Sequence, residues 1–510
     1  MYGYYILFNL FITLVILLIV YVKNVYSYWR RRGIPHERPT PPLGNLKGLG
    51  RTFHFRDMSL RYYKQFKGSA PYAGMYFFFW KVALVLDLEL VKQILTSNAN
   101  QFQNRGVYHN VRDDPLTGHL VALEGKQWRA MRNKLTPVFT SSKMKFMFPT
   151  IVTVSEHFAD ACQTMMQLDS DQNVDIKDLS ARYTTDVIGT CAFGIECNSL
   201  QDPNAEFRHR GRSIFEKPRH TPLILSLLNR NMNLARLLHI KVIRSDVSKF
   251  FLEVVKSTVQ FRIKNNVKRN DFMDLLIALK ASDEEAGKSR DGIDLSHGLT
   301  IEQMAAQAFV FFGAGFDTSS TTMACCLHEL ALQTPIQDKA RDEIFSVLSK
   351  HNNELTYEAM NDMHYLEQII METLRKHPVL PNLIRKTTTH FQAGSNRSHC
   401  LEEGITVIVP VHAIHHDPEF YPEPDLFDPE RFTQEAIKER PQMSYLPFGA
   451  GPRNCIGLRF GKMQAKIGLI TLLRRFKFTT SSRTENPIEI CNRNFMIRPK
   501  NGVYLRVDPI

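Results

Sequence analysis

The amino-terminal end of the chain is an uninterrupted apolar stretch. Residues 2–22 carry no charged side chain, and a helix of that length spans about 31 Å at 1.5 Å per residue, close to one hydrocarbon core. Lys23 and the arginines at 30–32 follow, and such basic flanks favour the cytosolic side. A cleaved signal peptide would need a basic start, a shorter apolar core and a small-residue cleavage site. This segment has none of them, so we predict an uncleaved transmembrane anchor over residues 1–22.

Prolines cluster directly after the basic residues. Pro35, Pro39, Pro41 and Pro42 lie close together, and prolines fix φ and stiffen a connector. We predict a basic, proline-rich hinge over residues 23–50, followed by a single catalytic body over residues 51–510. The hinge is either a plain linker or a semi-rigid element that sets how the body lies over the membrane.

Most of the body has helical periodicity, and only short segments have the alternation or β-branched content of strands. Residues 75–79 and 82–86 are strand-like, with Trp80 and Lys81 between them, which predicts a hairpin within residues 71–90. Residues 404–411, rich in Val and Ile, predict another short strand. The expected class is mainly α with a minor β-sheet region.

The longest predicted helix covers about residues 300–333. Thr300 and Gln303 form a capping-box pattern at its start, and Pro335 ends it. Its centre, residues 312–322, contains Gly313, Gly315 and several hydroxyl side chains, although glycine inside a helix costs about 1 kcal/mol relative to alanine. The centre is therefore either a place where a ligand approaches the backbone or an ordinary notch for helix packing.

Composition narrows the class of protein. The chain has 510 residues, of which 44% are hydrophobic and 23% charged, which excludes a disordered, collagen-like or polytopic membrane protein. The net charge of +13 suits an acidic partner or an anionic membrane surface. We expect no nucleic acid partner, because no nucleic-acid-binding motif accompanies the charge. The eight scattered cysteines suggest reduced thiols, and His328, His415 and His416 lack metal-ligand spacing.

The stretch from Phe448 to Gly457 carries the strongest chemical signal. Its glycines and proline predict a tight loop, and residues 458–473 predict a helix that places Cys455 near a helix amino terminus. Backbone N–H groups and the helix dipole at that end favour a thiolate. A lone cysteine is usually an inert buried residue, but here the glycines let donors approach the sulfur and Arg453 adds positive charge.

This stretch resembles the signature of the cytochrome P-450 family of haem-thiolate monooxygenases. The pattern Phe-x-x-Gly-x-Arg-x-Cys-x-Gly is met at every fixed position: Phe448, Gly451, Arg453, Cys455 and Gly457. The resemblance implies that Cys455 is the axial thiolate ligand to the iron of haem b, iron protoporphyrin IX. It also implies haem contacts from Phe448, Gly449, Gly457 and Ala314.

Four further motifs follow the family pattern in the same order. Residues 313–319 are similar to the oxygen-activating helix segment, with Asp317 and Thr318 as its acid–hydroxyl pair. Glu372, Arg375 and Arg431 are similar to the family's structural network. Trp128 and Arg132 match its haem-edge helix, and the resemblance implies that both, with Arg385 and Arg453, bind the haem propionates. Residues 105–108 and 134–137 are most like the insect xenobiotic-detoxifying branch.

The resemblance implies an oxidoreductase of class EC 1.14 that inserts one oxygen atom of O2 into lipophilic substrates. These would be xenobiotics such as insecticides or plant toxins, or endogenous lipids or hormones, with Asp317 and Thr318 delivering protons. The expected substrate contacts, each of which could equally be a core residue, are Tyr108, Phe309, Phe312, Leu380 and Phe495.

The expected partners are a reductase and a lipid bilayer. No glycine-rich nucleotide motif is found, so NADPH would act only through a flavoprotein reductase. Its docking face, unless that face is merely solvated, would be basic: Lys126, Arg129, Arg132, Lys134, Arg459 and Lys462. We expect the endoplasmic reticulum membrane, with the body on the cytosolic face and the sequon at Asn396 unmodified.

Two other functions fit the same residues. One is a haem isomerase or dehydratase of the same fold that needs no O2, and the other is a non-catalytic, membrane-tethered haem or ligand sensor. The Asp317–Thr318 pair favours the oxygenase over both.

Overall fold

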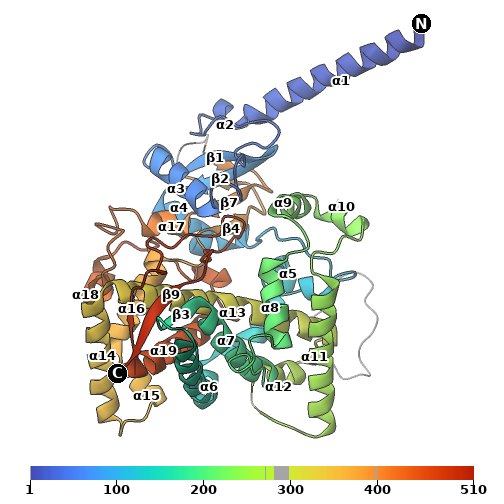
Figure 1. The fold of residues 1–510 in the computed structure, drawn as a ribbon. Helices are drawn as coiled ribbons and strands as arrows, with labels where there is room; N and C mark the ends of the chain where they lie inside the picture. Colours follow the sequence, from blue (N-terminus) through green and yellow to red (C-terminus); the bar gives the residue numbers. More distant parts are fainter. Residues whose placement is uncertain (1, 270, 281–297, 395, 397–398) are drawn as a thin grey trace.

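The computed structural model describes residues 2–269, 271–280, 298–394, 396 and 399–510 (Figure 1). A long amino-terminal helix, α1 (Tyr2–Tyr26), projects away from a body of packed helices and small sheets. None of its residues is buried, and it is long and apolar enough to cross a membrane. The helix ends at Tyr26, somewhat beyond the predicted end at residue 22. Arg397 and Ser398 of the predicted sequon lie outside the described residues.

Helices make up most of the body, as predicted. The first half contains α2 (Tyr28–Arg31), α3 (Phe55–Phe66), α4 (Leu88–Lys92), α5 (Gly125–Leu135), α6 (Ser141–Leu168), α7 (Ile176–Ile188), α8 (Glu206–Glu216), α9 (Pro222–Arg230), α10 (Met232–Leu237), α11 (Ser245–Lys264) and α12 (Phe272–Ala278). The second half contains α13 (Ile301–Leu332), α14 (Thr334–Lys350), α15 (Tyr357–Asp362), α16 (His364–Lys376), α17 (Val411–His415), α18 (Gln434–Glu439) and α19 (Leu458–Arg475).

The largest sheet has the strand order β1-β2-β7-β4 and lies next to α2 and α3 (Figure 1). Its strands are β1 (Tyr72–Phe77), β2 (Trp80–Val85), β7 (Thr406–Val409) and β4 (Leu383–Lys386). The predicted hairpin is confirmed, but its turn is formed by Phe78 and Phe79 and not by Trp80 and Lys81, which pair with Phe77 and Tyr76. The other strands are β3 (Asn173–Asp175), β8 (Phe476–Thr479), β9 (Tyr504–Pro509), β5 (Phe391–Gln392) and β6 (Cys400–Leu401).

The long helix α13 runs through the centre of the body and begins as predicted. Thr300 Oγ1 accepts from the Gln303 N–H at 3.2 Å, and Gln303 Oε1 accepts from the Thr300 N–H at 3.0 Å, so the capping box is present. Pro335 lies in the first turn of the next helix, α14. The helix has 32 residues, which corresponds to about 48 Å.

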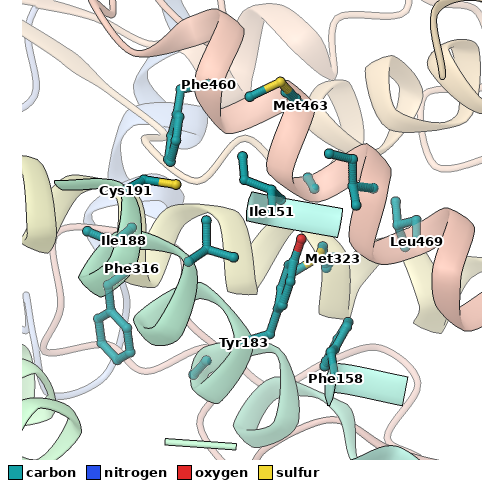
Figure 2. Packing of buried hydrophobic residues seen from close by; sticks show 14 of the residues in the cluster. Ile151, Phe158, Tyr183, Ile188, Cys191, Phe316, Met323, Phe460, Met463 and Leu469 are labelled. Atoms are coloured by element: carbon teal, nitrogen blue, oxygen red, sulfur yellow. The ribbon is translucent and has the colours of Figure 1, made fainter. Parts of the chain in front are cut away.

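The main core surrounds α13 and joins it to α6, α7 and α19. Figure 2 shows Phe158 of α6 beside Tyr183 of α7, and their rings stack with centroids 4.4 Å apart. Met323 of α13 lies close to Gly468 of α19, where an added Cβ would lie 2.9 Å from the Met323 sulfur. This tight packing fixes α19, and with it the loop that carries Cys455, against the centre of α13.

The proline-rich segment lies against the edge of the main sheet. Trp29 is fully buried, and its Nε1 donates to the Met75 carbonyl at 3.0 Å. Gly74 leaves room for the indole ring, because a Cβ there would lie 2.3 Å from it. The Gly74 N–H donates to the Pro35 carbonyl at 2.8 Å. The segment predicted as a hinge is therefore packed against the body over its first half.

Candidate active site

The loop before α19 brings Cys455 to an internal position. Gly449 and Gly451 have φ values of +68° and +69°, where a side chain is strained, and a Cβ on Gly451 would lie 1.7 Å from the Leu95 carbonyl oxygen. The Cys455 N–H donates to the Phe448 carbonyl at 2.9 Å and closes the loop. The helix follows at Leu458, as the sequence predicted.

Cys455 differs from every other cysteine of the chain because its side chain is exposed. Loss of water nevertheless raises the pKa of its thiol, whereas a hydrogen bond from the Gly457 backbone and the charges of Arg132 and Arg105 lower that pKa. An exposed thiol within such desolvating surroundings faces an internal hollow. The hydrogen bond and the two cations favour a bound thiolate there.

The centre of α13 forms another wall of this hollow. Ala314 is exposed and Thr318 partly exposed, although most residues of α13 are buried. Gln464 of α19 donates to the Gly315 carbonyl at 3.2 Å, so the start of α19 and the loop before it lie alongside this part of α13. Val121 and Ile384 are also exposed, by 37% and 38%, and we assign their surfaces to the same hollow.

Five successive carbonyl groups of α13 accept side-chain hydrogen bonds. The pairs are Thr318 Oγ1 to Ala314 at 2.6 Å, Gln464 Nε2 to Gly315 at 3.2 Å, Thr184 Oγ1 to Phe316 at 2.9 Å, Lys177 Nζ to Asp317 at 3.3 Å and Thr322 Oγ1 to Thr318 at 3.0 Å. Such side-chain bonds compete with the helical ladder. The helix stays continuous, but its centre is more polar than a simple packing notch requires.

Asp317 and Thr318 lie on different sides of α13. Thr318 is partly exposed, whereas Asp317 is buried and its Oδ1 accepts from Lys177 Nζ at 2.9 Å. Burial raises the pKa of Asp317, but Lys177 and Arg498, the latter 3.8 Å away, outweigh it and hold that pKa below its usual value. The structure thus places the Asp317 carboxylate in an ion pair and not on the Thr318 hydroxyl.

Four arginines gather around the Cys455 loop and form what we call the arginine cradle: Arg105, Arg132, Arg385 and Arg453. Within the described residues, none of them forms an ion pair with a carboxylate. Arg453 donates to the carbonyls of Gln103, Leu120 and Leu123, and Arg132 donates to Asn454. Within the described residues, the arginines of the cradle therefore donate hydrogen bonds to uncharged acceptors only.

The pKa values of three cradle arginines are low because burial and neighbouring cations act on them. Burial and repulsion by neighbouring arginines lower the pKa of Arg105 to about 10, of Arg385 to about 9 and of Arg453 to about 8. A cavity of about 440 Å³ opens beside Trp128, Arg132, Arg385 and Arg453, and the Arg453 guanidinium lies 4.1 Å from the centre of the Trp128 ring. Guanidinium groups match carboxylates, so these residues fit the two propionates of a haem.

The predicted structural network is assembled. Arg375 Nε and Nη2 donate to the two Glu372 oxygens at 2.7 and 2.8 Å, and Arg431 Nε lies 3.7 Å from Glu372. Both Glu372 and Arg375 are fully buried. The Asp428 N–H also donates to Glu372 at 2.9 Å, which joins α16 to the segment before Cys455.

The predicted substrate residues lie in different surroundings. Tyr108 is buried and its hydroxyl donates to the Ile240 carbonyl at 2.8 Å. Phe309 and Phe312 pack around Phe251 in the core. Leu380 is partly exposed, and Phe495 is 61% exposed. The structure therefore does not bring these five residues together as one lining.

Sequence reasoning missed residues that the structure brings to the site. Arg105 belongs to the cradle, and its Nη2 donates to the Arg453 carbonyl at 3.0 Å across 348 positions of sequence. Val121 and His119 were also missed. No local motif marks these residues, because only the folded loops bring them to the hollow.

The predicted basic face is only partly free. Lys126, Arg129 and Arg459 are exposed, Arg132 turns inward to Asn454, and Lys462 forms an ion pair with Glu367. In the part of the chain that the structure describes, no group of three or more His, Cys, Asp or Glu side chains could hold a metal ion.

Comparisons with known proteins agree with this geometry. A model of the family described as cytochrome P450 matches residues 34–506. The chain is 56% identical over 490 residues to a Drosophila melanogaster protein described as probable cytochrome P450 6a14, with 96% of each chain covered. It is 49% identical to probable cytochrome P450 6a13 of the same organism, with 97% of each covered. It is 44% identical to cytochrome P450 6A1 of Musca domestica, with 97% of this chain and 96% of the other covered.

Proposed function

This chain belongs to the cytochrome P450 family, and on that premise we propose that it oxidises lipophilic small molecules with electrons from an NADPH-dependent flavoprotein reductase. As a member it is a haem-binding monooxygenase, an oxidoreductase. The observation that carries the proposal is the arginine cradle beside the exposed Cys455 thiol. Four cations that pair with no carboxylate among the described residues, next to a single candidate thiolate ligand, fit one haem group.

Each part of the site has a separate role in holding the cofactor. Cys455 would bind the iron, and the cradle with Trp128 would bind the propionates. Phe448, Gly449, Gly457 and Ala314 would lie against the ring. Haem, when bound, supplies the activation of O2 on which the oxidation depends.

The centre of α13 would handle protons. Thr318 Oγ1 now donates to the Ala314 carbonyl and can turn this proton toward the hollow by rotation about χ1. The Asp317 carboxylate would leave Lys177, bind a water molecule and relay protons through it to this hydroxyl from the buried side. Its lowered pKa keeps it ionised at neutral pH, so it would relay protons and not store one.

The surfaces around the hollow indicate the substrate class. Ala314, with Val121 and Ile384, which we assign to the hollow, exposes apolar atoms, and an apolar lining selects lipophilic ligands. Xenobiotics such as insecticides or plant toxins, and endogenous lipids or hormones, belong to that class.

Two surfaces support attachment to a membrane with the body on the cytosolic face, which we assign to the endoplasmic reticulum. The first is the exposed helix α1, followed by Lys23 and the arginines at 30–32. The second is an apolar patch on and beside α9 and α10: Leu223, Ile224, Leu227, Leu234, Leu237 and Leu238. An exposed patch of this kind marks an interaction surface, and the bilayer that receives α1 is the partner we assign to it.

The reductase would dock on the exposed part of the basic face. Lys126→Glu with Arg129→Glu should slow reductase-driven turnover and leave peroxide-driven turnover unchanged. Lys264→Glu on α11, also an exposed basic residue, is the control. Equal loss in both assays would overturn docking at this face.

The activity itself is tested by reconstituting the full chain with reductase, NADPH and isotopically labelled O2. A library of lipophilic compounds should yield products that carry one labelled oxygen atom each. Products formed without O2 or NADPH would indicate the isomerase or dehydratase. A protein that binds haem but yields no product would indicate the sensor.

A further inference from the structure

Helix α5 is held loosely at the edge of the body. Of its eleven residues, only Trp128, Met131 and Leu135 are buried. At its start, Gly125 has a φ of +53° and open space around it, and Pro137 lies just beyond its end. An element with few buried side chains opens at a lower free-energy cost than the core does, so α5 is a part of the body that can move outward.

The segment opposite α5 is fixed to the body. This segment, residues 99–104, contains the short 3-10 helix η2 (Ala99–Phe102). The Lys386 N–H of β4 donates to the Asn104 carbonyl at 2.8 Å, which ties the segment to the main sheet. The Asn104 side chain in turn accepts from the Gly125 N–H at 3.0 Å. The start of α5 is therefore anchored, and an outward movement would turn the helix about Gly125.

The cavity of about 440 Å³ beside the arginine cradle lies between these two walls. The buried side chains of Arg385 and Arg453 line its inner end. Its lining also includes Asn100, Arg129 and Asn133, which are exposed, so the cavity reaches solvent at this edge. Arg129 Nη2 on α5 donates to Asn100 Oδ1 on η2 at 2.8 Å. This hydrogen bond joins the two walls at the outer end of the cavity.

The cavity leads to the end of the haem that the cradle would bind. The propionates are the charged end of an otherwise largely apolar group, and guanidinium groups match them. Elsewhere around the hollow, α13 and α19 are packed closely, with Gly468 against Met323, and would separate only if the core opened. The edge between η2 and α5 is therefore the route for haem that disrupts the fewest buried contacts.

We propose that haem enters and leaves the protein between η2 and α5, and that the hydrogen bond between Arg129 and Asn100 is the latch that keeps this route closed. The proposal rests on the haem site proposed above and adds what controls the rate at which that site loads and empties. The latch holds the route closed whether or not haem is bound. Its loss should therefore speed the passage of haem in both directions without changing the affinity for haem.

The test follows haem transfer from the haem-loaded enzyme to serum albumin, at an albumin concentration that leaves part of the haem on the enzyme. Asn100→Ala and Arg129→Met should each reach the end point about 3-fold faster, as expected for the loss of one hydrogen bond. The double variant should be no faster than either, because both changes remove the same bond. Lys126→Met, which removes another exposed cation of α5, should keep the natural rate.

The amount of haem left on the enzyme at the end point should be the same in all of these variants. Natural transfer rates in Asn100→Ala and Arg129→Met would overturn the proposal. An end point shifted toward albumin would assign the two residues to direct haem binding and overturn it as well. The reduced carbon-monoxide spectrum, recorded before transfer, reports separately on the proposed function, because the thiolate-type band does not depend on how fast haem passes α5.

Discussion

Two groups of arginines near Cys455 are buried in different ways. In the structural network, Arg375 is fully buried and forms two hydrogen bonds with Glu372. In the arginine cradle, Arg385 and Arg453 are also buried, but carbonyl groups are their acceptors and no carboxylate pairs with them among the described residues. The first group contains its own anion, and the second does not.

This difference indicates which buried arginines are neutralised by the protein itself and which need a bound group. A buried guanidinium without a counter-charge is strongly unfavourable, so a fold keeps such a cluster only where an anion arrives from outside. The lowered pKa values of Arg105, Arg385 and Arg453 express the same deficit. The network stabilises the body by itself, whereas we propose that the haem completes the cradle.

The largest expected effect comes from breaking the network. Glu372→Gln should lower the free energy of unfolding by about 3–5 kcal/mol, because it leaves Arg375 buried without its anion. Denaturant unfolding measures this, with Glu358→Gln as control. Glu358 pairs with Lys145 on the surface, where both side chains are more than half exposed, and its loss should cost less than about 1 kcal/mol. A Glu372 variant as stable as the control would contradict the view that the structural network, unlike the arginine cradle, is neutralised by its own carboxylate.

Acidification should lower the free energy of unfolding through the buried histidines near the structural network. Burial, with the charge of Arg375, lowers the pKa of His416 to about 3, and burial also holds the pKa of His412 and His415 well below the usual value. The unfolded chain binds these protons below about pH 6.5 and the folded chain does not. Stability is therefore present above that pH and is lost on acidification, by about 2 kcal/mol per histidine between pH 7 and pH 5.

His416→Gln isolates one of these contributions. The variant should lose about 2 kcal/mol less than the natural chain between pH 7 and pH 5 when unfolding is followed by denaturant titration. Replacing the exposed His390 by Gln should leave the pH dependence unchanged. If both variants gave the same slope as the natural chain, the buried histidines would not be the source of the acid sensitivity.

Removing an arginine from the cradle should affect stability in the opposite direction from removing one from the network. Arg385→Met removes an unpaired buried charge, so the haem-free protein should be as stable as the natural chain or more so. The haem-loaded variant should lose its haem about 10-fold faster, measured as transfer to excess apomyoglobin. Arg375→Met, the matched change in the network, should destabilise both forms. A haem-free Arg385 variant that is clearly less stable would contradict the contrast.

The sequence predicted the parts of the site that depend on local patterns. The Cys455 loop follows from its glycines, and the start of α13 follows from Thr300 and Gln303, which are three residues apart. The hairpin turn was misplaced because aromatic residues favour strands. Phe79 instead stacks on Tyr26 at the base of α1, with ring centres 5.7 Å apart, and Phe78 adopts a positive φ of 53° in the turn.

Long-range placement was not predictable from any local pattern. Arg105 joins the cradle through a bond to the Arg453 carbonyl, and nothing around position 105 signals this. Asp317 and Thr318 are adjacent in sequence, but consecutive helical residues lie about 100° apart around the axis. One therefore faces the hollow while the other pairs with Lys177.

We propose that Cys455 and the cradle together hold a haem. The most direct measurement is the absorption spectrum of the reduced carbon-monoxide adduct of Cys455→Ser, with Cys400→Ser as control. The thiolate-type band should be lost in the Cys455 variant and retained in the control. A Cys455→Ser protein that kept the spectrum of the natural chain would contradict it.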